Sequence, residues 1–408
     1  MQRDVAIVGV GLHPWGRYPE KKMQEMGAVA IINALKDAKI KWTEIDGIVA
    51  GAYHWDHVYG GMYGLLAGNA LSMAFGELNV PVYNVANACA TGGSVISVGY
   101  MMIASGLHDV VLAVAADKSG LGFFPPKSRD KDDVDYVRYS MTGETNPAYW
   151  AMELRRRWFE LGLDEKENER LLAKPKAMLS EAGARNPYAR YKRKFTIEEV
   201  LKSPMVADPF RLYMICSTSD GAAAMILTTL EKAKKITDKP VLIEGATCVS
   251  SKFGEPCTRL PTMSSFPRHG VPRLSDARKA VERVYKLSGR RPDEIDVIEQ
   301  PDHSPWHYFE YLEVVLQLSE NERGTAEKMV EKEETHPLTG KVPVCPSGGA
   351  SSFGEVLTAD GIMRVCELVW QLRGQAGERQ IKKDLKVGLA ITYGYMGNNA
   401  AVVVSKAW

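Results

Sequence analysis

Apolar residues recur along this chain in short unbroken runs that alternate with longer amphipathic stretches. Val5 to Gly11 (VAIVGVG) is a run typical of a strand buried on both faces, and the apolar spacing over Gly27 to Ala38 predicts an amphipathic helix after it. The segment Glu44 to Ile48 (EIDGI) then leads into the next apolar run. This alternation of strands and helices predicts an α/β fold.

The same order of patterns returns in the second half of the chain. Val241 to Ala246 (VLIEGA) opens it, Ala277 to Ser288 is again amphipathic, and Glu294 to Ile298 (EIDVI) follows its counterpart by 250 residues. Two further pairs of segments match in the same order: 80–82 with 342–344, and 109–115 with 387–392. We therefore expect two duplicated α/β halves packed around shared central helices.

Between the halves the chain is charged and irregular. From about 125 to 202 it carries helical stretches such as Tyr149 to Leu161, and we expect this segment to be an inserted loop or lid over one face. The resulting division assigns 1–124 and 203–238 to the N-terminal half, 125–202 to the insertion and 239–408 to the C-terminal half.

Composition excludes several classes of protein. Lys plus Arg number 51 and Asp plus Glu 50, so the net charge of +1 provides no broad field for a nucleic acid. No apolar run approaches the ~18 residues of a membrane span, and the N-terminus lacks a secretion signal, so we expect a cytoplasmic protein without membrane association. The six cysteines show no CxxC spacing, which favours reduced thiols and no metal in this chain.

The segment from Asn84 to Gly106 (NVANACATGGSVISVGYMMIASG) carries the strongest chemical signal. It places Cys89 between a predicted strand and a helix that opens with small residues. Free backbone N–H groups and the helix dipole stabilise a thiolate at such a position, which makes Cys89 a candidate nucleophile. A cysteine at a helix start is nevertheless more often a packed thiol, and the segment alone does not decide between the two.

The surrounding motifs extend this signal over nearly the whole chain. ACATGG after the VYN strand, SDGAAA at 219–224 and CPSGGASSFG at 345–354, together with the duplication, resemble the thiolase superfamily, above all its sterol-carrier and archaeal types. The resemblance implies a five-layer αβαβα fold. It also implies that Cys89 attacks a β-ketoacyl-CoA to form an acyl-enzyme, which coenzyme A resolves as co-substrate. A condensing ketoacyl synthase would need a Cys-His-His or Cys-His-Asn set that the sequence does not offer.

Three catalytic motifs of that superfamily are altered here. His303 stands in the His-Asp-Cys-Phe segment, which reads PDHS, and Glu355 replaces the histidine of Gly-His-Pro. Gly397 survives from Cys-x-Gly, whose cysteine is Tyr395. In one interpretation Glu355 accepts the Cys89 proton, and the Gly397 N–H completes an oxyanion hole.

In that interpretation His303 or His307 donates to the enolate oxygen. In the alternative interpretation both histidines are ordinary helix-start residues and Glu355 is a solvated charge. The chain would then be a catalytically silent scaffold that binds acyl-CoA within a thiolase complex.

The resemblance also suggests how ligands and partners bind. Arg155, Arg190 and Arg193 lie in the insertion, where thiolases contact the CoA nucleotide, although a solvated helix face explains them equally well. It further implies a homodimeric core and a small zinc-ribbon and OB-fold partner subunit.

Aromatic residues crowd the segments that would line the acyl pocket: Tyr53, His54, Trp55, His57, Tyr59, Phe123, Phe124, Trp306, His307, Tyr308 and Phe309. Flat side chains suit a ring-bearing acyl group, although loop aromatics also pack interfaces. The chain is similar in this respect to benzoylsuccinyl-CoA thiolases, whose products would be benzoyl-CoA and succinyl-CoA.

Overall fold

The computed structural model of the chain describes residues 3–52, 74–76, 78–118, 145–250, 275–394 and 398–408. Several residues that the sequence singles out lie outside these ranges: Tyr53, His54, Trp55, His57, Tyr59, Phe123, Phe124, Tyr395 and Gly397. The predictions attached to them stay predictions.

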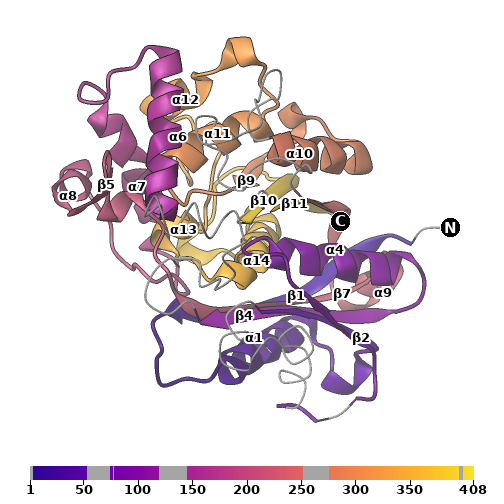
Figure 1. The fold of residues 1–408 in the computed structure, drawn as a ribbon. Coiled ribbons are helices and arrows are strands. Elements are labelled where there is room, and N and C mark those ends of the chain that lie inside the picture. The colour runs from indigo at the N-terminus through magenta and orange to yellow at the C-terminus, as the bar shows by residue number, and fades with distance from the viewer. Residues whose placement is uncertain (1–2, 53–73, 77, 119–144, 251–274, 395–397) are drawn as a thin grey trace, which may run out of the picture.

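The principal strands of the described chain form one continuous sheet in the order β3-β2-β4-β7-β1-β8-β11-β10-β9 (Figure 1). Their bounds are β1 Val5–Gly16, β2 Gly47–Gly51, β3 Val82–Val85, β4 Val110–Lys118, β7 Asp220–Thr229, β8 Val241–Val249, β9 Val297–Glu299, β10 Val387–Gly394 and β11 Asn398–Lys406. Near its middle, β1 pairs antiparallel with β8 over only three residues of each. This short seam joins the two halves.

Each half repeats the same strand order outward from the seam. In each half the strand that comes last in the chain, β7 in the first half and β11 in the second, runs antiparallel to both of its neighbours in the sheet. The strand pairs farther from the seam are parallel. The third strand of the second half is reduced to one parallel bridge between Ile298 and Val344, where the first half pairs Ile48 with Val82. The predicted duplication is therefore confirmed.

The repeated EID segments perform the same task in both halves. The Asp46 carboxylate accepts hydrogen bonds from the backbone N–H groups of Asp109 and Val110 at 2.7 and 3.0 Å. The Asp296 carboxylate accepts from those of Lys386 and Val387 at 2.7 and 2.9 Å. Each aspartate thus satisfies the donors at the start of the neighbouring parallel strand, which explains why the pattern recurs.

Helices and sheets alternate in five layers (Figure 1). Helix α1 covers one outer face, α4 and α14 lie between the two half-sheets and contact each other, and α10 and α11 cover the other outer face. Three buried apolar clusters fill the spaces between the layers. The helices are α1 Met23–Ala38, α4 Thr91–Ala104, α9 Leu230–Ile236, α10 Ser275–Ser288, α11 Pro305–Val315, α12 Thr325–Glu331, α13 Gly349–Ser352 and α14 Asp360–Arg373. The predicted α/β fold in five layers is confirmed.

The central helices approach each other through glycine. A Cβ on Gly92 of α4 would lie 2.6 Å from the carbonyl oxygen of Thr358, and one on Gly361 of α14 would lie 2.3 Å from the backbone nitrogen of Gly93. Such distances leave no room for a side chain. The small residues after Cys89 therefore bring the starts of the two central helices together.

The inserted segment packs beside the second half rather than extending the sheet (Figure 1). The Arg157 guanidinium in α6 is fully buried and pairs with Glu310, Glu313 and Glu327 at 2.7 to 3.0 Å. These carboxylates belong to α11 and α12, so a buried charge network fixes the insertion to the C-terminal half. The described helices of this region are α6 Asn146–Leu161, α7 Glu169–Gly183 and α8 Ile197–Lys202, and the two-stranded sheet of β5 Met205–Ala207 and β6 Phe210–Arg211 follows it. No helix among the described residues is long and apolar enough to cross a membrane.

Candidate active site

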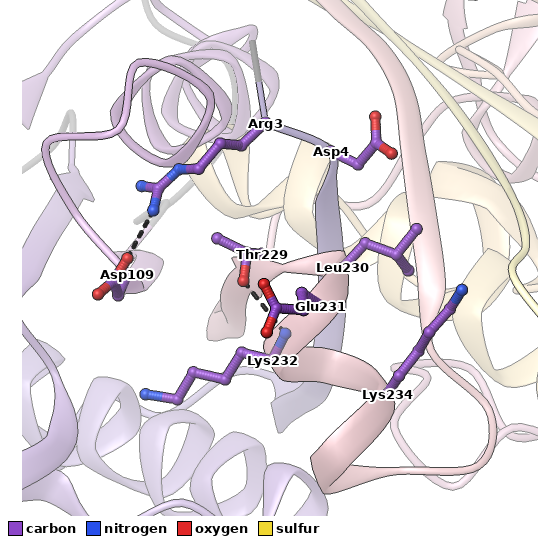
Figure 2. A pocket seen from close by; sticks show the side chains of 8 residues that line it. All are labelled: Arg3, Asp4, Asp109, Thr229, Leu230, Glu231, Lys232 and Lys234. Atoms are coloured by element: carbon purple, nitrogen blue, oxygen red, sulfur yellow. Dashed lines mark hydrogen bonds and ion pairs between the residues drawn. The ribbon is translucent and has the colours of Figure 1, made fainter. Parts of the chain in front are cut away.

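Two clefts of the described surface lie at the amino ends of the parallel strands. One, of about 530 Å³, is lined by Arg3, Asp109 and Thr229, with Arg3 and Asp109 ion-paired at 2.7 Å (Figure 2). The other, of about 590 Å³, occupies the equivalent place in the second half, beside Asp296 and Val387. Ligands of open α/β sheets bind at the opposite, carboxyl ends of the strands. We therefore expect the active site in the loops at the carboxyl ends of the strands.

Cys89 lies in such a loop, between the end of β3 and the start of α4. The preceding residue, Ala88, has a φ of +47°, an uncommon conformation for a residue with a side chain. The Thr91 hydroxyl holds this turn by donating to the Ala88 carbonyl at 2.6 Å and accepting from the Asn87 N–H at 2.8 Å. Cys89 thereby precedes the N-cap residue Ala90 of α4, close to the predicted helix start, and its side chain is neither fully buried nor fully exposed.

His303 and Glu355 meet across the loops of the second half. His303 follows β9 and Glu355 follows the Val344 bridge, and the Nε2 atom of His303 lies 3.0 Å from Oε2 of Glu355. Both side chains are buried, with 2% and 0% of their surface exposed. The alternative in which Glu355 is a solvated loop charge does not fit this burial. The catalytic roles of both residues remain predictions.

The pKa values of Glu355 and His303 are both raised above their ordinary values. Burial, and then the nearby Asp360 carboxylate, raises the pKa of Glu355 to about 6, although His303 opposes the shift. Burial disfavours the imidazolium of His303, but the Glu355 carboxylate outweighs it and raises the pKa of His303 above its ordinary value. A carboxyl whose pKa is raised towards neutrality is the kind of group that general acid/base catalysis uses.

One short segment after the insertion fixes the backbone of both residues. The Cys216 N–H donates to the His303 carbonyl at 2.9 Å. The Glu355 N–H donates to the Ser217 carbonyl at 2.7 Å, and the Glu355 carbonyl accepts from Ser219 at 2.8 Å. The sequence patterns did not predict this role for Cys216. The SDGAAA motif, which begins at Ser219, was the available signal.

Cys89 belongs to the same electrostatic neighbourhood. Burial raises the pKa of the Cys216 thiol far above its usual range, and negative charge on Glu355, Asp302 and Cys89 raises it further. In addition, Gly92 of α4 packs against Thr358, three residues after Glu355. The start of α4 and the loop after Glu355 are thus in contact, and a catalytic contact between Cys89 and Glu355 stays a prediction.

A network of buried charges surrounds the pair. The Arg364 guanidinium in α14 donates to Asp360 at 2.7 Å and lies 3.5 and 3.7 Å from carboxylate oxygens of Glu299 and Asp302. Burial opposes its charge, yet these acids raise the pKa of Arg364 well above the ordinary value. Burial also raises the pKa of Glu299 to about 8, despite Arg364. A single fixed cation therefore balances several acids behind His303 and Glu355.

His303, Glu355 and Asp360 are also the described residues whose geometry approaches that of a metal site. One potential ligand atom of each lies within 4.8 Å of the others. Arg364 already contacts Asp360, however, and Glu355 already pairs with His303. Guanidinium and imidazole thus supply the positive charge that a metal ion would bring, and the arrangement fits an acid/base pair better. That the chain binds no metal remains a prediction.

His307 lies beside the pair but differs from it in charge. Its ring centre is 5.2 Å from that of His303, and its Nδ1 atom is 2.9 Å from the Ser304 hydroxyl. Burial, and then the charge of His303, lowers the pKa of His307 well below the ordinary value. His307 is therefore a neutral ring at physiological pH, and His303 is the stronger candidate for the acid.

The aromatic residues expected to line an acyl pocket on α11 lie in the core. Trp306, Tyr308 and Phe309 are buried within the apolar cluster of the second half, and the Tyr308 hydroxyl donates to the Thr335 carbonyl at 3.4 Å. They stabilise α11, the helix that begins directly after His303. The expectation of a pocket along this helix has no support from the described residues.

The three arginines expected near the CoA nucleotide already have protein partners. Arg155 pairs with Glu165 and Asp208, and Arg193 pairs with Glu199 at 3.0 Å on the surface. Arg190 instead donates inward, to the Thr218 carbonyl and the Ser219 hydroxyl. Arg190 therefore supports the segment that holds Glu355, and a phosphate contact for any of the three stays a prediction.

Comparisons with known proteins agree with this architecture. Residues 263–407 match the family model "Thiolase C-terminal domain-like". The acetyl-CoA acetyltransferase of Methanothermobacter thermautotrophicus is 31% identical over 408 residues, covering 98% of both chains. Benzoylsuccinyl-CoA thiolase subunit BbsB of Thauera aromatica is 27% identical, covering 95% of this chain and 94% of its own. The solved structure "Ltp2-ChsH2(DUF35) aldolase" superposes with a TM-score of 0.78 at 21% identity over 99% of this chain and 98% of its own. On its sequence, its duplicated layers and these relatives, the chain belongs to the thiolase family of acyltransferases.

Proposed function

We propose that this protein is a thiolase-type acyl-CoA C-acyltransferase that cleaves a β-ketoacyl-CoA with coenzyme A as co-substrate. The observation that carries the proposal is the buried His303–Glu355 pair, 3.0 Å apart, in the same electrostatic neighbourhood as Cys89. Burial of a carboxylate against an imidazole destabilises the fold unless the charge has a function. The pair therefore argues against a catalytically silent scaffold.

The proposed reaction proceeds in two half-reactions. The Cys89 thiol gives its proton to the Glu355 carboxylate, and the thiolate attacks the keto carbon of the substrate. The carbon–carbon bond then breaks, its electron pair stays on the departing acyl-CoA fragment as an enolate, and the His303 imidazolium protonates that fragment. The thiol of coenzyme A finally attacks the acyl-enzyme and transfers its proton to His303, and the departing Cys89 thiolate takes back the proton held by Glu355.

We propose a ring-bearing acyl group, with benzoylsuccinyl-CoA as the first substrate to test. The relative from Thauera aromatica, whose name contains that substrate, supports this choice at 27% identity. The aromatic residues of segments 53–59 and 123–124 support it from the sequence, although they lie outside the described residues. Benzoyl-CoA and succinyl-CoA would be the products.

We also propose a cytoplasmic homodimer with a small partner subunit that combines a zinc ribbon with an OB fold. Strand β3 lies at the edge of the sheet and exposes 46% of Tyr83, and Met101 on α4 is 58% exposed. An edge strand with exposed apolar neighbours favours pairing with a second copy. The partner subunit is suggested by the neighbour whose title names a DUF35 component beside the thiolase-like chain.

Intact-mass spectrometry after incubation with benzoylsuccinyl-CoA or acetoacetyl-CoA tests the acyl-enzyme. The wild-type protein should gain the mass of one acyl group, and Cys89→Ala should gain none while it retains its fold by circular dichroism. An adduct that persists in Cys89→Ala would exclude Cys89 as the acyl carrier. Binding of CoA without any adduct or turnover, even with the partner subunit added, would support the scaffold alternative.

A second candidate is retro-aldol cleavage of a β-hydroxyacyl-CoA. The replacement of the Gly-His-Pro histidine by Glu355 favours it, and the superposed structure is titled an aldolase. Glu355 would take the hydroxyl proton, the carbon–carbon bond would break to an aldehyde or ketone, and His303 would protonate the enolate. This route forms no Cys89 adduct, so release of a carbonyl product by Cys89→Ala would favour it over thiolysis.

A further inference from the structure

A buried lysine of the insertion contacts the loop that carries Glu355. Lys176 lies on α7 and is only 3% exposed. Its Nζ atom donates to the Ser351 carbonyl and, at 2.9 Å, to the Ser352 hydroxyl. It also lies 4.4 and 4.7 Å from the ring centres of Phe195 and Tyr191. Burial lowers the pKa of Lys176 to about 7, although the Asp302 carboxylate opposes the shift. In its protonated form the amine is stabilised by these dipoles and aromatic faces.

The contact completes a clamp on α13, the single helical turn from Gly349 to Ser352. At its start, the Asp302 carboxylate accepts from the N–H groups of Ala350 and Ser351 at 2.6 and 3.0 Å. At its end, Lys176 binds the Ser351 carbonyl. An anion thus meets the free N–H groups and a cation meets the free carbonyl, which is the stabilising arrangement for a helical turn.

The clamp holds both members of the catalytic pair. Asp302 directly precedes His303, and Ser352 precedes Glu355 by three residues. Between them the insertion adds backbone bonds, since Tyr191 donates to the Ser352 carbonyl at 3.1 Å and Arg190 to that of Phe353 at 2.9 Å. No other described lysine side chain contacts α13 through a recorded hydrogen bond or ion pair.

We propose that Lys176 is a positioning residue that couples the insertion to the His303–Glu355 pair. By fixing α13 between Asp302 and itself, it sets the 3.0 Å separation of the two side chains. The inference rests on the proposed function only for its effect on turnover. The geometric coupling is independent of which carbon–carbon cleavage the enzyme performs.

The test compares Lys176→Met with Lys174→Met, a matched control on the same helix whose bonds go to Glu331 and Glu333 instead. Lys176→Met should lower kcat by about 10- to 100-fold and leave KM within about threefold, because a small displacement of a reacting group has effects of this size. Lys174→Met should retain the wild-type kcat. Ser352→Ala, which removes only one of the two acceptors, should show a smaller loss and serves if Lys176→Met does not fold.

An NMR titration of histidine side chains supplies a readout that does not need turnover. The His303 resonance is assigned by its loss in His303→Gln. Glu355 raises the pKa of His303, so separation of the pair in Lys176→Met should lower that pKa towards the ordinary value of histidine. A merely structural lysine would reduce thermal stability and leave the titration unchanged.

Equal His303 titrations in wild type and Lys176→Met, or equal kcat values, would overturn the inference. A wild-type protein without thiolysis or aldol activity would overturn the proposed function instead. In that event the titration alone decides whether Lys176 positions the pair. The two failures are therefore distinguishable.

Discussion

The two halves of this molecule share a frame but differ sharply in the loops that follow their third strands. In the first half, Cys89 sits in a partly exposed turn held by the neutral side chain of Thr91. In the second half, the loop ends at Glu355, which is fully buried against His303 and backed by the Arg364 network. One half carries the predicted nucleophile near a helix start, and the other carries buried charge.

The comparison shows which features are the same in the two duplicated halves and which differ between them. The strand order and the Asp46 and Asp296 contacts are the same in both halves, because every parallel strand needs its backbone donors satisfied. The loops have no such common requirement and differ in residue type, burial and charge. The contact between α4 and α14 joins the helices that follow the two loops.

The largest expected effect is the loss of kcat on substitution of Glu355 in the second half. Glu355→Gln should lower kcat by about 10²- to 10⁴-fold, the usual contribution of a positioned general base. Because Glu355 accepts a proton only when ionised and its pKa is raised to about 6, wild-type activity should fall as the pH drops below about 6. The glutamine variant should lack this limb in its pH–rate profile. Wild-type kcat in Glu355→Gln would remove Glu355 from the proton transfer, and exposed Glu378→Gln is the control.

The next largest effect is on the free energy of unfolding, through the buried charge network around Arg364 in the second half. Arg364→Leu leaves Asp360, Glu299 and Asp302 without their common cation, and removal of one partner from a buried network typically costs about 3 to 5 kcal/mol. Urea unfolding should register that loss in the free energy of unfolding. Arg291→Leu, on an arginine with a 69% exposed side chain, should leave it close to the wild-type value. Similar losses in the two variants would contradict the assignment of the network.

The shared frame predicts equal effects in the two halves. Asp46→Asn and Asp296→Asn each weaken two charge-assisted hydrogen bonds to a strand start, and each should cost about 1.5 to 3 kcal/mol. Thermal unfolding of the two variants measures this directly. Stability losses that differ by more than about twofold between the two variants would contradict the equivalence of the two halves.

The smallest effect concerns the turn of the first half. Glycine tolerates the φ of +47° at Ala88 without the steric cost that alanine carries, but it also loses more freedom on folding. Ala88→Gly should therefore change the free energy of unfolding by at most about 1 kcal/mol and leave kcat near the wild-type value. A large loss of activity would mean that the strained turn itself sets the position of Cys89, and alkylation of Cys89 by iodoacetamide would measure that change.

Several features of the site were predictable because they are local or repeated. The EID segments, the apolar periods and the small residues after Cys89 specify strands, helices and the turn between them within a few residues of each other. His303 and Glu355 could be singled out by their place in known motifs. Their burial and their contact could not, because the loops that carry them are about 50 residues apart in the chain.

Other features had no local signal. Segment 216–219 holds the backbone of both His303 and Glu355, and Lys176 reaches Ser352 from 176 residues earlier in the chain. Arg190, expected to face a nucleotide, turns inward to Thr218. A lysine or arginine in an amphipathic segment has the same pattern whether it faces water or a buried carbonyl.

The sequence by itself determined the two halves, the order of strand and helix within each, and the position of Cys89 at a helix start, since hydrophobic period and turn residues act over short distances. Only the tertiary structure decided which charges are buried together, because burial depends on the packing of segments that no local pattern relates. That packing raises the pKa of Glu355 to about 6 and thereby gives an ordinary carboxylate the proton affinity of a base at neutral pH.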